Sequence, residues 1–343
     1  MKKSLFYLTM ITMCCIIFLH PVKSHADNSS SFSVEVDYPE IQNPRVGEAG
    51  YFDLLVAPNE SYELSLIVKN YSNKPITVVA KAGRATTSEG GALNYQSSLK
   101  ESSSENKKVN IPYELDMNNL LELKESDIRV EPNDQKKVIL YLKSPVTEFK
   151  GELLGGVYFT EEPDFEKNRD KTVINQFSYS IPILIRMHDE EKVENNITLG
   201  HVGPELRNHH PFIGVELIND QPSIVRNLKV DGKIINKKND KVVYIKKEDS
   251  YQVASYSILN FGFDLQDTPM KSGNYEVDLK IDADGKKYEL KKDFVIKNTE
   301  AKKFNENAVF VEKEDNSIWF YLIIATLVII MLIYFINKIR KRI

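Results

Sequence analysis

The sequence contains very little cysteine and tryptophan, and both shortages restrict what the protein can do. Its two cysteines, Cys14 and Cys15, lie side by side near the start, and its single tryptophan, Trp319, lies near the end. The long stretch between them can form no disulfide and no cysteine-ligated zinc site. Because it also lacks an indole ring, any sugar bound there must be held by tyrosine, phenylalanine or polar side chains.

Motifs that carry catalysis or metal binding are also missing. There is no Ser-His-Asp arrangement and no G-x-S-x-G elbow. His209 and His210 are adjacent, so in a strand they would point to opposite faces and could not bind one ion together. The segment "DADGKK" at 282–287 resembles a calcium loop, but its alignment places Lys280 and Lys291 at positions that require acids. The sequence therefore predicts a protein that is not an enzyme and uses no metal or cofactor, and "DADG" is interpreted as a hairpin turn.

The first 26 residues have the pattern of a secretory signal peptide. A short basic start, 1–3, precedes an apolar run at 5–19. Small Ser24 and Ala26 then occupy the −3 and −1 positions of a cleavage site before Asp27. The sequence predicts cleavage between Ala26 and Asp27, with an uncleaved membrane anchor as the alternative.

A second apolar segment, 318–336, contains no charged residue. At about 1.5 Å per residue its length nearly matches a hydrocarbon core of about 30 Å, so it is interpreted as a single transmembrane helix rather than a buried core helix. The basic tail at 337–343 is expected in the cytoplasm and the preceding ectodomain outside. The residues expected at the two membrane interfaces are Trp319, Tyr321, Tyr334, Lys338 and Arg340.

The predicted ectodomain is acidic. The two terminal segments contain no acid, which leaves 38 basic and 49 acidic residues outside, a net charge of −11. Such a surface disfavours bulk attraction to nucleic acid or to anionic wall polymers. The Lys-rich stretch at 229–247 is a local exception. We interpret it as the solvated faces of two strands, with a binding patch as the alternative.

Alternating apolar and polar residues predict an all-β fold. Short runs with a period of two recur between turn signals such as "NYSNKP", "VDGK" and "KSGN", which is typical of antiparallel β-sandwiches. The segment "GYFDLLVAPNESYELSLIVKN" at 50–70 alternates, breaks at Pro58-Asn59 and alternates again. The other clear runs are at 32–36, 76–82, 138–142, 181–185 and 275–281.

The length of the ectodomain suits two tandem immunoglobulin-like β-sandwich domains. The charged, proline-containing stretch at 161–171 is the best candidate for the boundary between them. The expected organisation is therefore a signal peptide at 1–26, a first sandwich at 27–160, a linker at 161–171, a second sandwich at 172–300, a juxtamembrane segment at 301–317, the helix at 318–336 and the tail at 337–343.

Several pieces of the sequence, taken in order, resemble the WxL-interacting proteins of Gram-positive bacteria. These pieces are "FSVEVDYPEIQ", "GYFDLLVAPNESYELSLIVKN", "ATTSEGGALNY", "LLGGVYF", "FSYSIPILIR", "GNYEVDLKI" and "FVIKNTEAKKFNENA". The resemblance implies a first domain that binds peptidoglycan and a second that binds host surfaces. It also implies association with secreted WxL-domain proteins. One departure is Ser88, which follows Thr87 where the family usually has asparagine, and this puts the binding of peptidoglycan in question.

These observations lead to a functional hypothesis with alternatives. The leading one is a membrane-tethered, non-enzymatic scaffold that holds WxL-domain proteins at the Gram-positive cell wall. The second is an adhesin whose distal domain binds host matrix proteins directly, and the third is a wall hydrolase with a hidden site. The candidate binding residues are Tyr51, Asp53, Thr87 and Tyr95, although aromatic residues at strand positions more often pack in a core.

Overall fold

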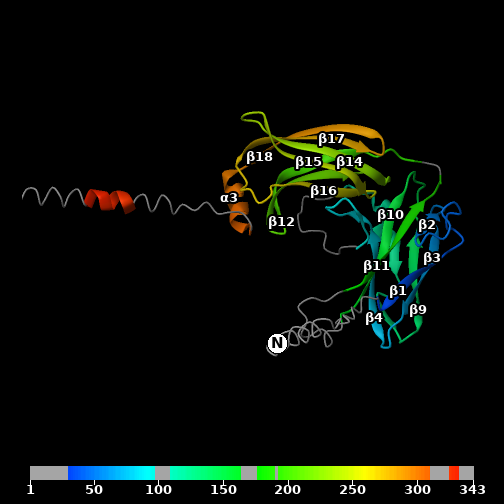
Figure 1. Ribbon diagram of the computed structural model, residues 1–343. Helices are drawn as coiled ribbons and strands as arrows, with labels where there is room; N and C mark the ends of the chain where they lie inside the picture. Colours follow the sequence, from blue (N-terminus) through cyan, green and yellow to red (C-terminus); the bar gives the residue numbers. More distant parts are fainter. Residues whose placement is uncertain (1–29, 97–108, 164–175, 190–191, 310–323, 332–343) are drawn as a thin grey trace, which may run out of the picture.

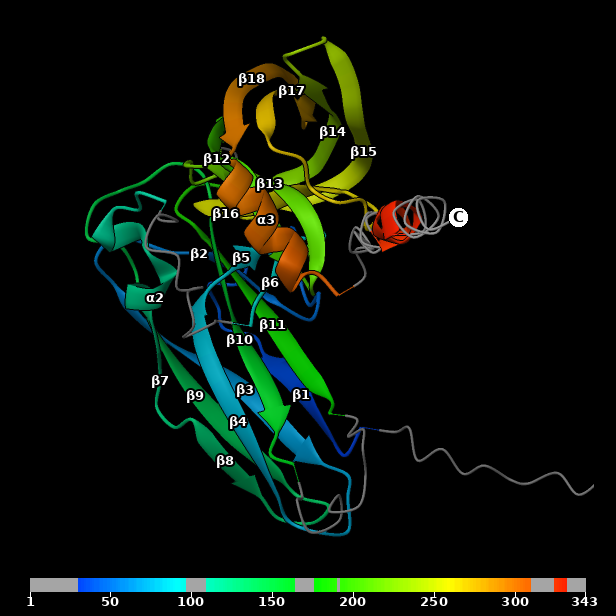
Figure 2. The same cartoon turned by 90° about the vertical axis from the view of Figure 1, so that its left-hand side faces the viewer.

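The computed structural model describes residues 30–96, 109–163, 176–189, 192–309 and 324–331. Two β-sandwiches follow one another along the chain, and the second lies across one end of the first (Figures 1 and 2). The predicted all-β character of the ectodomain is therefore confirmed.

The predictions for the two termini fall largely outside the described residues. These include the signal peptide, its cleavage between Ala26 and Asp27, and the membrane-interface residues Trp319, Tyr321, Tyr334, Lys338 and Arg340. Residues 324–331, inside the predicted span, are helical. Within the described ranges, no helix is both long enough and apolar enough to cross a bilayer. The membrane anchor stays a prediction.

The first sandwich consists of two sheets that enclose one apolar core. Four strands form one sheet, in the order β1 (Phe32–Asp37), β3 (Ser61–Asn70), β9 (Gln135–Lys143) and β7 (Leu121–Leu123). Five strands form the other, in the order β2 (Phe52–Leu55), β11 (Ser178–Arg186), β10 (Leu153–Glu161), β4 (Ile76–Arg84) and β8 (Asp127–Val130). A short hairpin of β5 (Thr86–Thr87) and β6 (Leu93–Asn94), the turn η1 (Tyr113–Leu115) and helix α2 (Met117–Leu120) complete it.

The alternation in the segment at 50–70 produces β2 and β3 as expected. Leu64, Leu66 and Val68 are fully buried on the core side of β3. The break between the strands contains Asn59 with a φ of 58°, a left-handed conformation that asparagine tolerates in turns. At the far end of β3, the Asn70 side-chain amide donates to the carbonyls of Lys74, Val130 and Glu131 at 2.8, 3.1 and 3.0 Å. This amide explains why the strand ends there, because it satisfies three turn carbonyls.

The expected domain boundary differs from the one in the structure. The sequence places 172–300 in the second sandwich, yet β11 lies inside the first, antiparallel to β10 and parallel to β2. Ile181, Ile183 and Ile185 of β11 belong to the first core. The charged stretch at 161–171 therefore lies in the connection between two paired strands, and the first sandwich ends after Arg186.

The second sandwich also has two sheets. One has the order β12 (Ile197–Arg207), β13 (His210–Asn219) and β16 (Ser257–Asp264), and the other β15 (Lys241–Val253), β14 (Val225–Asn236), β17 (Gly273–Ala283) and β18 (Lys286–Ile296). The turn between β17 and β18 contains Asp284 and Gly285, with φ of 52° and 94°, so the hairpin interpretation of "DADG" is confirmed. Helix α3 (Asn298–Asn307) follows and buries Ala301 against this core.

Candidate functional site

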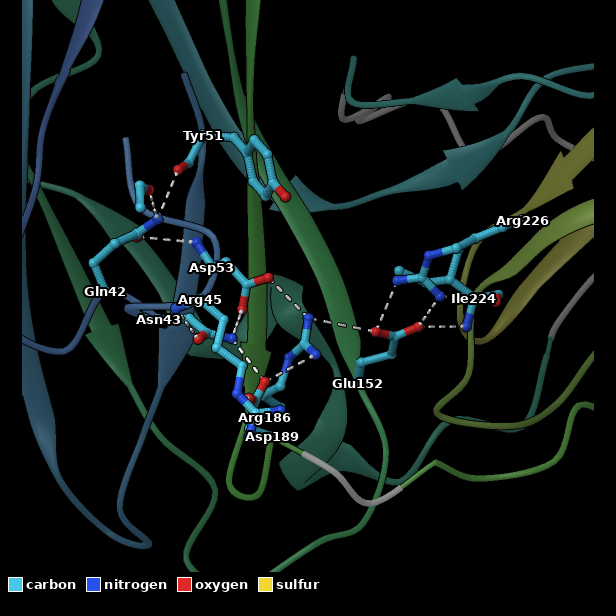
Figure 3. Close-up of polar contacts among 11 residues, drawn as sticks. Gln42, Asn43, Arg45, Tyr51, Asp53, Glu152, Arg186, Asp189, Ile224 and Arg226 are labelled. Carbon is cyan, nitrogen blue, oxygen red and sulfur yellow. Dashed lines mark hydrogen bonds and ion pairs between the residues drawn. The ribbon is translucent and has the colours of Figure 1, made fainter. Parts of the chain in front are cut away.

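Asp53 lies at the centre of a buried polar cluster in the first sandwich (Figure 3). Its side chain is on β2 and is 2% exposed. The guanidinium of Arg186, at the end of the neighbouring parallel strand β11, contacts it at 2.8 Å. The Asn43 amide donates to Asp53 at 3.4 Å and to Asp189 at 2.8 Å. Burial raises the pKa of Asp53, because removal from water disfavours the charged carboxylate, while Arg186 opposes this shift.

The cluster continues across the boundary between the two sandwiches. Arg186 also lies 3.7 Å from the carboxylate of Glu152 in the first sandwich. Glu152 in turn accepts two hydrogen bonds from the guanidinium of Arg226 on β14, at 2.5 and 2.9 Å. The same carboxylate accepts from the backbone N–H of Ile224 at 3.3 Å. A paired Arg–carboxylate fork of this kind fixes relative orientation as well as contributing energy.

A cleft of about 780 Å³ opens beside this chain of ion pairs, between the two sandwiches. Such a volume is within the range of small-molecule sites, about 300 to 1,000 Å³. Four acids and four bases line it, so neither a purely anionic nor a purely cationic ligand is favoured. These residues are Glu152, Asp189, Glu194, Asp284, Arg186, Lys192, Arg226 and Lys286.

The hairpin of β5 and β6 makes a second polar contact between the sandwiches. The Thr87 hydroxyl lies 2.8 Å from that of Ser257 and accepts from the Ala254 N–H at 3.1 Å. At the hairpin turn, the carbonyl of Gly91 accepts from the Gln252 N–H at 2.6 Å. A Cβ at Gly91 would lie 2.1 Å from the Tyr251 ring, so only glycine permits this approach. The hairpin, defined as residues 86–94, is called the clasp below.

Apolar packing seals the same interface. Ala85, Leu154 and Leu184 of the first sandwich form one buried cluster with Ile224 and Ala254 of the second. Tyr256, from the second sandwich, packs into the core of the first. The two sandwiches therefore share buried apolar contacts and are not joined by a linker alone.

The structure separates the predicted binding residues into different environments. Asp53 is the centre of the ion-pair cluster, and the Tyr51 carbonyl accepts from the Gln42 amide at 3.4 Å beside it. Thr87 is 7% exposed and lies in the clasp, inside the interdomain contact. Tyr95 is half-buried against the interdomain apolar cluster, and burial raises the pKa of its phenol, with nearby Tyr51 contributing. Ser88 closes the clasp turn by accepting from the Ala92 N–H at 3.1 Å. A ligand role for these residues stays a prediction.

Sequence reasoning missed Arg186, Glu152 and Arg226. Each is a single charged residue at or near a strand end, a position that solvated residues commonly occupy. Their pairing depends on strands far apart in the chain, so no local spacing could identify them. In the part of the chain that the structure describes, no three potential metal ligands lie together.

Comparisons with known proteins match each sandwich to a different family model. Residues 32–161 match the model described as "WxL Interacting Protein, peptidoglycan binding domain", and residues 168–306 match "WxL Interacting Protein, host binding domain". The second match begins before β11, which the structure packs into the first sandwich. No match was found among curated proteins.

Solved structures with detectable similarity include several chaperones. The Pseudomonas aeruginosa CupB2 chaperone is 18% identical with a TM-score of 0.25, covering 68% of this chain and 93% of its own. The Escherichia coli chaperone DraB is 13% identical with a TM-score of 0.28, covering 78% and 98%. The CsuC–CsuE complex of Acinetobacter baumannii is 14% identical with a TM-score of 0.30, covering 68% and 90%. At these scores the likenesses carry no functional argument.

Proposed function

Because this chain belongs to the WxL-interacting protein family, with a peptidoglycan-binding domain model at 32–161 and a host-binding domain model at 168–306, we propose that it is a non-enzymatic surface scaffold. It holds secreted WxL-domain proteins at the peptidoglycan and, through the predicted helix at 318–336, at the cell membrane. The first sandwich contacts the wall and the second presents a surface to the WxL-domain partner.

The observation that supports this proposal is the extensive junction between the two sandwiches. The ion pairs from Asp53 through Arg186 and Glu152 to Arg226, the clasp and the interdomain apolar cluster all join the same two bodies. A protein with only independent binding tasks gains nothing from such a junction. A scaffold gains a fixed direction, because attachment of one sandwich to the wall then orients the other.

Binding of the ectodomain to each proposed partner tests the scaffold function. Residues 27–316 are incubated with purified peptidoglycan in a sedimentation assay, and with an immobilised WxL-domain protein in a pull-down. We expect both to retain the ectodomain. An unrelated acidic immunoglobulin-like ectodomain serves as the control for non-specific retention. Failure to bind the WxL-domain protein would contradict the scaffold proposal.

An adhesin is the second candidate, because the second sandwich matches a domain model described as host binding. In that case the ectodomain binds immobilised host matrix proteins without any WxL-domain protein. Adding purified WxL-domain protein distinguishes the two proposals. A scaffold binds matrix only through the added partner, whereas an adhesin binds equally well in its absence.

A further inference from the structure

Strand β15 has an open edge in the second sandwich. It is the first strand of its sheet and pairs on one side only, with β14. It lies at the margin of the molecule in Figure 2. The pairing with β14 shifts register between Tyr244 and Val242 and again between Tyr251 and Glu248. These irregularities leave a regular stretch from Tyr244 to Glu248, and Val243 has no partner residue on β14 where the register shifts.

The open edge carries exposed apolar side chains. Val242, Val243 and Ile245 are 47%, 41% and 62% exposed, although β-branched residues in a sheet are normally packed. Natural edge strands are usually kept from pairing by charged residues, prolines or a covering element. Lys241, Lys246 and Lys247 are charges of this kind, yet the three apolar residues among them are left exposed on the unpaired edge.

The other end of the same strand already accepts a backbone partner. The Gln252 N–H donates to the Gly91 carbonyl of the clasp at 2.6 Å. The first sandwich thus uses the edge of β15 close to residue 252. Among the described residues, the stretch 241–249 is joined in a sheet to β14 alone. Its outer edge is available to another chain.

The charge around the open edge restricts what can pair with it. Residues 237–249 contain five lysines and three acids, although the predicted ectodomain as a whole carries −11. Three of these lysines, Lys237, Lys246 and Lys247, already pair with Asp293, Glu248 and Asp231. Lys238 and Lys241 are exposed next to the valines. These two exposed lysines and the exposed apolar residues beside them suit an extended segment with apolar residues at alternate positions and carboxylates near one end.

We propose that the edge of β15 between Lys241 and Asp249 is the docking site for an extended, acidic and apolar strand of a partner protein, which pairs with it as an added strand. This inference rests on the proposed function, in which the partner is a WxL-domain protein. A second copy of this chain suits the edge less well, because both strands would carry the same excess of lysine and both ectodomains the same net charge.

Substitutions on the edge test the proposal in the whole ectodomain. Val243→Lys with Ile245→Lys should weaken binding of the purified WxL-domain protein about tenfold or more, since it places charge on the apolar contact. Val295→Lys is the matched control, because Val295 is 56% exposed on β18 of the same sheet. It should bind within about twofold of the unmodified protein. Equal binding by the edge variant and the unmodified ectodomain would overturn the proposal while leaving the scaffold function intact.

A second measurement does not depend on the WxL-domain protein. A synthetic peptide that alternates valine with aspartate and threonine is added to the ectodomain, and amide hydrogen exchange is followed. Slower exchange confined to 241–249 is expected, and it should disappear when alternate peptide nitrogens are methylated. If this protection is seen but the ectodomain does not bind the WxL-domain protein, the scaffold function is refuted and the edge site is retained. Absence of protection at 241–249 would overturn the proposal. A dimer of the ectodomain that is dissociated by Ile245→Lys would also overturn it, because the occupant of the edge would then be a second copy of this chain.

Discussion

Truncation after residue 160 should prevent the first sandwich from folding. The sequence pattern predicts that 27–160 is a complete domain, but the structure places β11 between β10 and β2, inside a five-stranded sheet. A fragment that ends at 160 lacks this strand. It therefore leaves β10 and β2 without their common neighbour and opens the apolar core to water.

The magnitude of the loss follows from burial. Ile181, Ile183 and Ile185 are 6%, 0% and 0% exposed in the first core. Burying a large aliphatic side chain contributes roughly 1.5–3 kcal/mol, so these three contribute roughly 5 to 9 kcal/mol. A domain of this size is stable by only about 5–15 kcal/mol, so the loss removes most or all of its stability.

Circular dichroism with thermal melting of two fragments checks this reasoning. Residues 27–189 should show a β-type spectrum and a cooperative transition, whereas 27–160 should show neither. The full ectodomain, 27–316, provides the reference spectrum and should melt at the highest temperature, because it also retains the interdomain contacts. A cooperative transition of the 27–160 fragment at the same midpoint as 27–189 would refute the placement of β11.

Three smaller predictions concern the interface. Thr87→Val should destabilise the ectodomain by about 1–3 kcal/mol in urea unfolding, because the Ala254 N–H loses its buried acceptor, while Thr86→Val in the same clasp should change stability far less. Gly91→Ala should release the clasp, since its Cβ would overlap the Tyr251 ring and its φ is 70°, and faster proteolysis of the clasp would show this; unchanged proteolysis would contradict the contact. Burial raises the pKa of Tyr251 from its usual value of 10 to about 12, so the unfolded chain loses this proton first and stability should fall as pH rises above 10. In the Tyr251→Phe variant, stability should fall less steeply with pH in that range. A pH dependence identical to that of the unmodified protein would count against the burial of this phenol.

Local sequence patterns were sufficient for the strands but not for the junction. The runs at 32–36, 76–82 and 275–281 correspond to β1, β4 and β17, because alternation reflects a face that each strand buries by itself. The ion-pair cluster could not be predicted in the same way. Asp53 and Arg186 meet only because β2 and β11 pair in parallel, and Glu152 reaches them from a third segment.

The misplaced boundary has a related cause. A charged segment with a proline has the composition of a linker, and 161–171 meets that description. Connections between strands of one sheet commonly have the same composition as interdomain linkers, since connecting segments in general run over the protein surface. Only the pairing of β10 with β11 distinguishes them, and that is a contact between residues such as Val157 and Ile181. Thr87 shows the same limit, because its position in a polar hairpin suggests an exposed residue while the second sandwich buries it.

Formation of a ternary complex tests the scaffold account most directly. Purified peptidoglycan is mixed with the WxL-domain protein, with and without residues 27–316, and the amount of WxL-domain protein in the pellet is measured. The WxL-domain protein should sediment with the wall in proportion to the added ectodomain, up to saturation. Equal sedimentation with and without the ectodomain, or displacement of the ectodomain from the wall by the WxL-domain protein, would contradict the account.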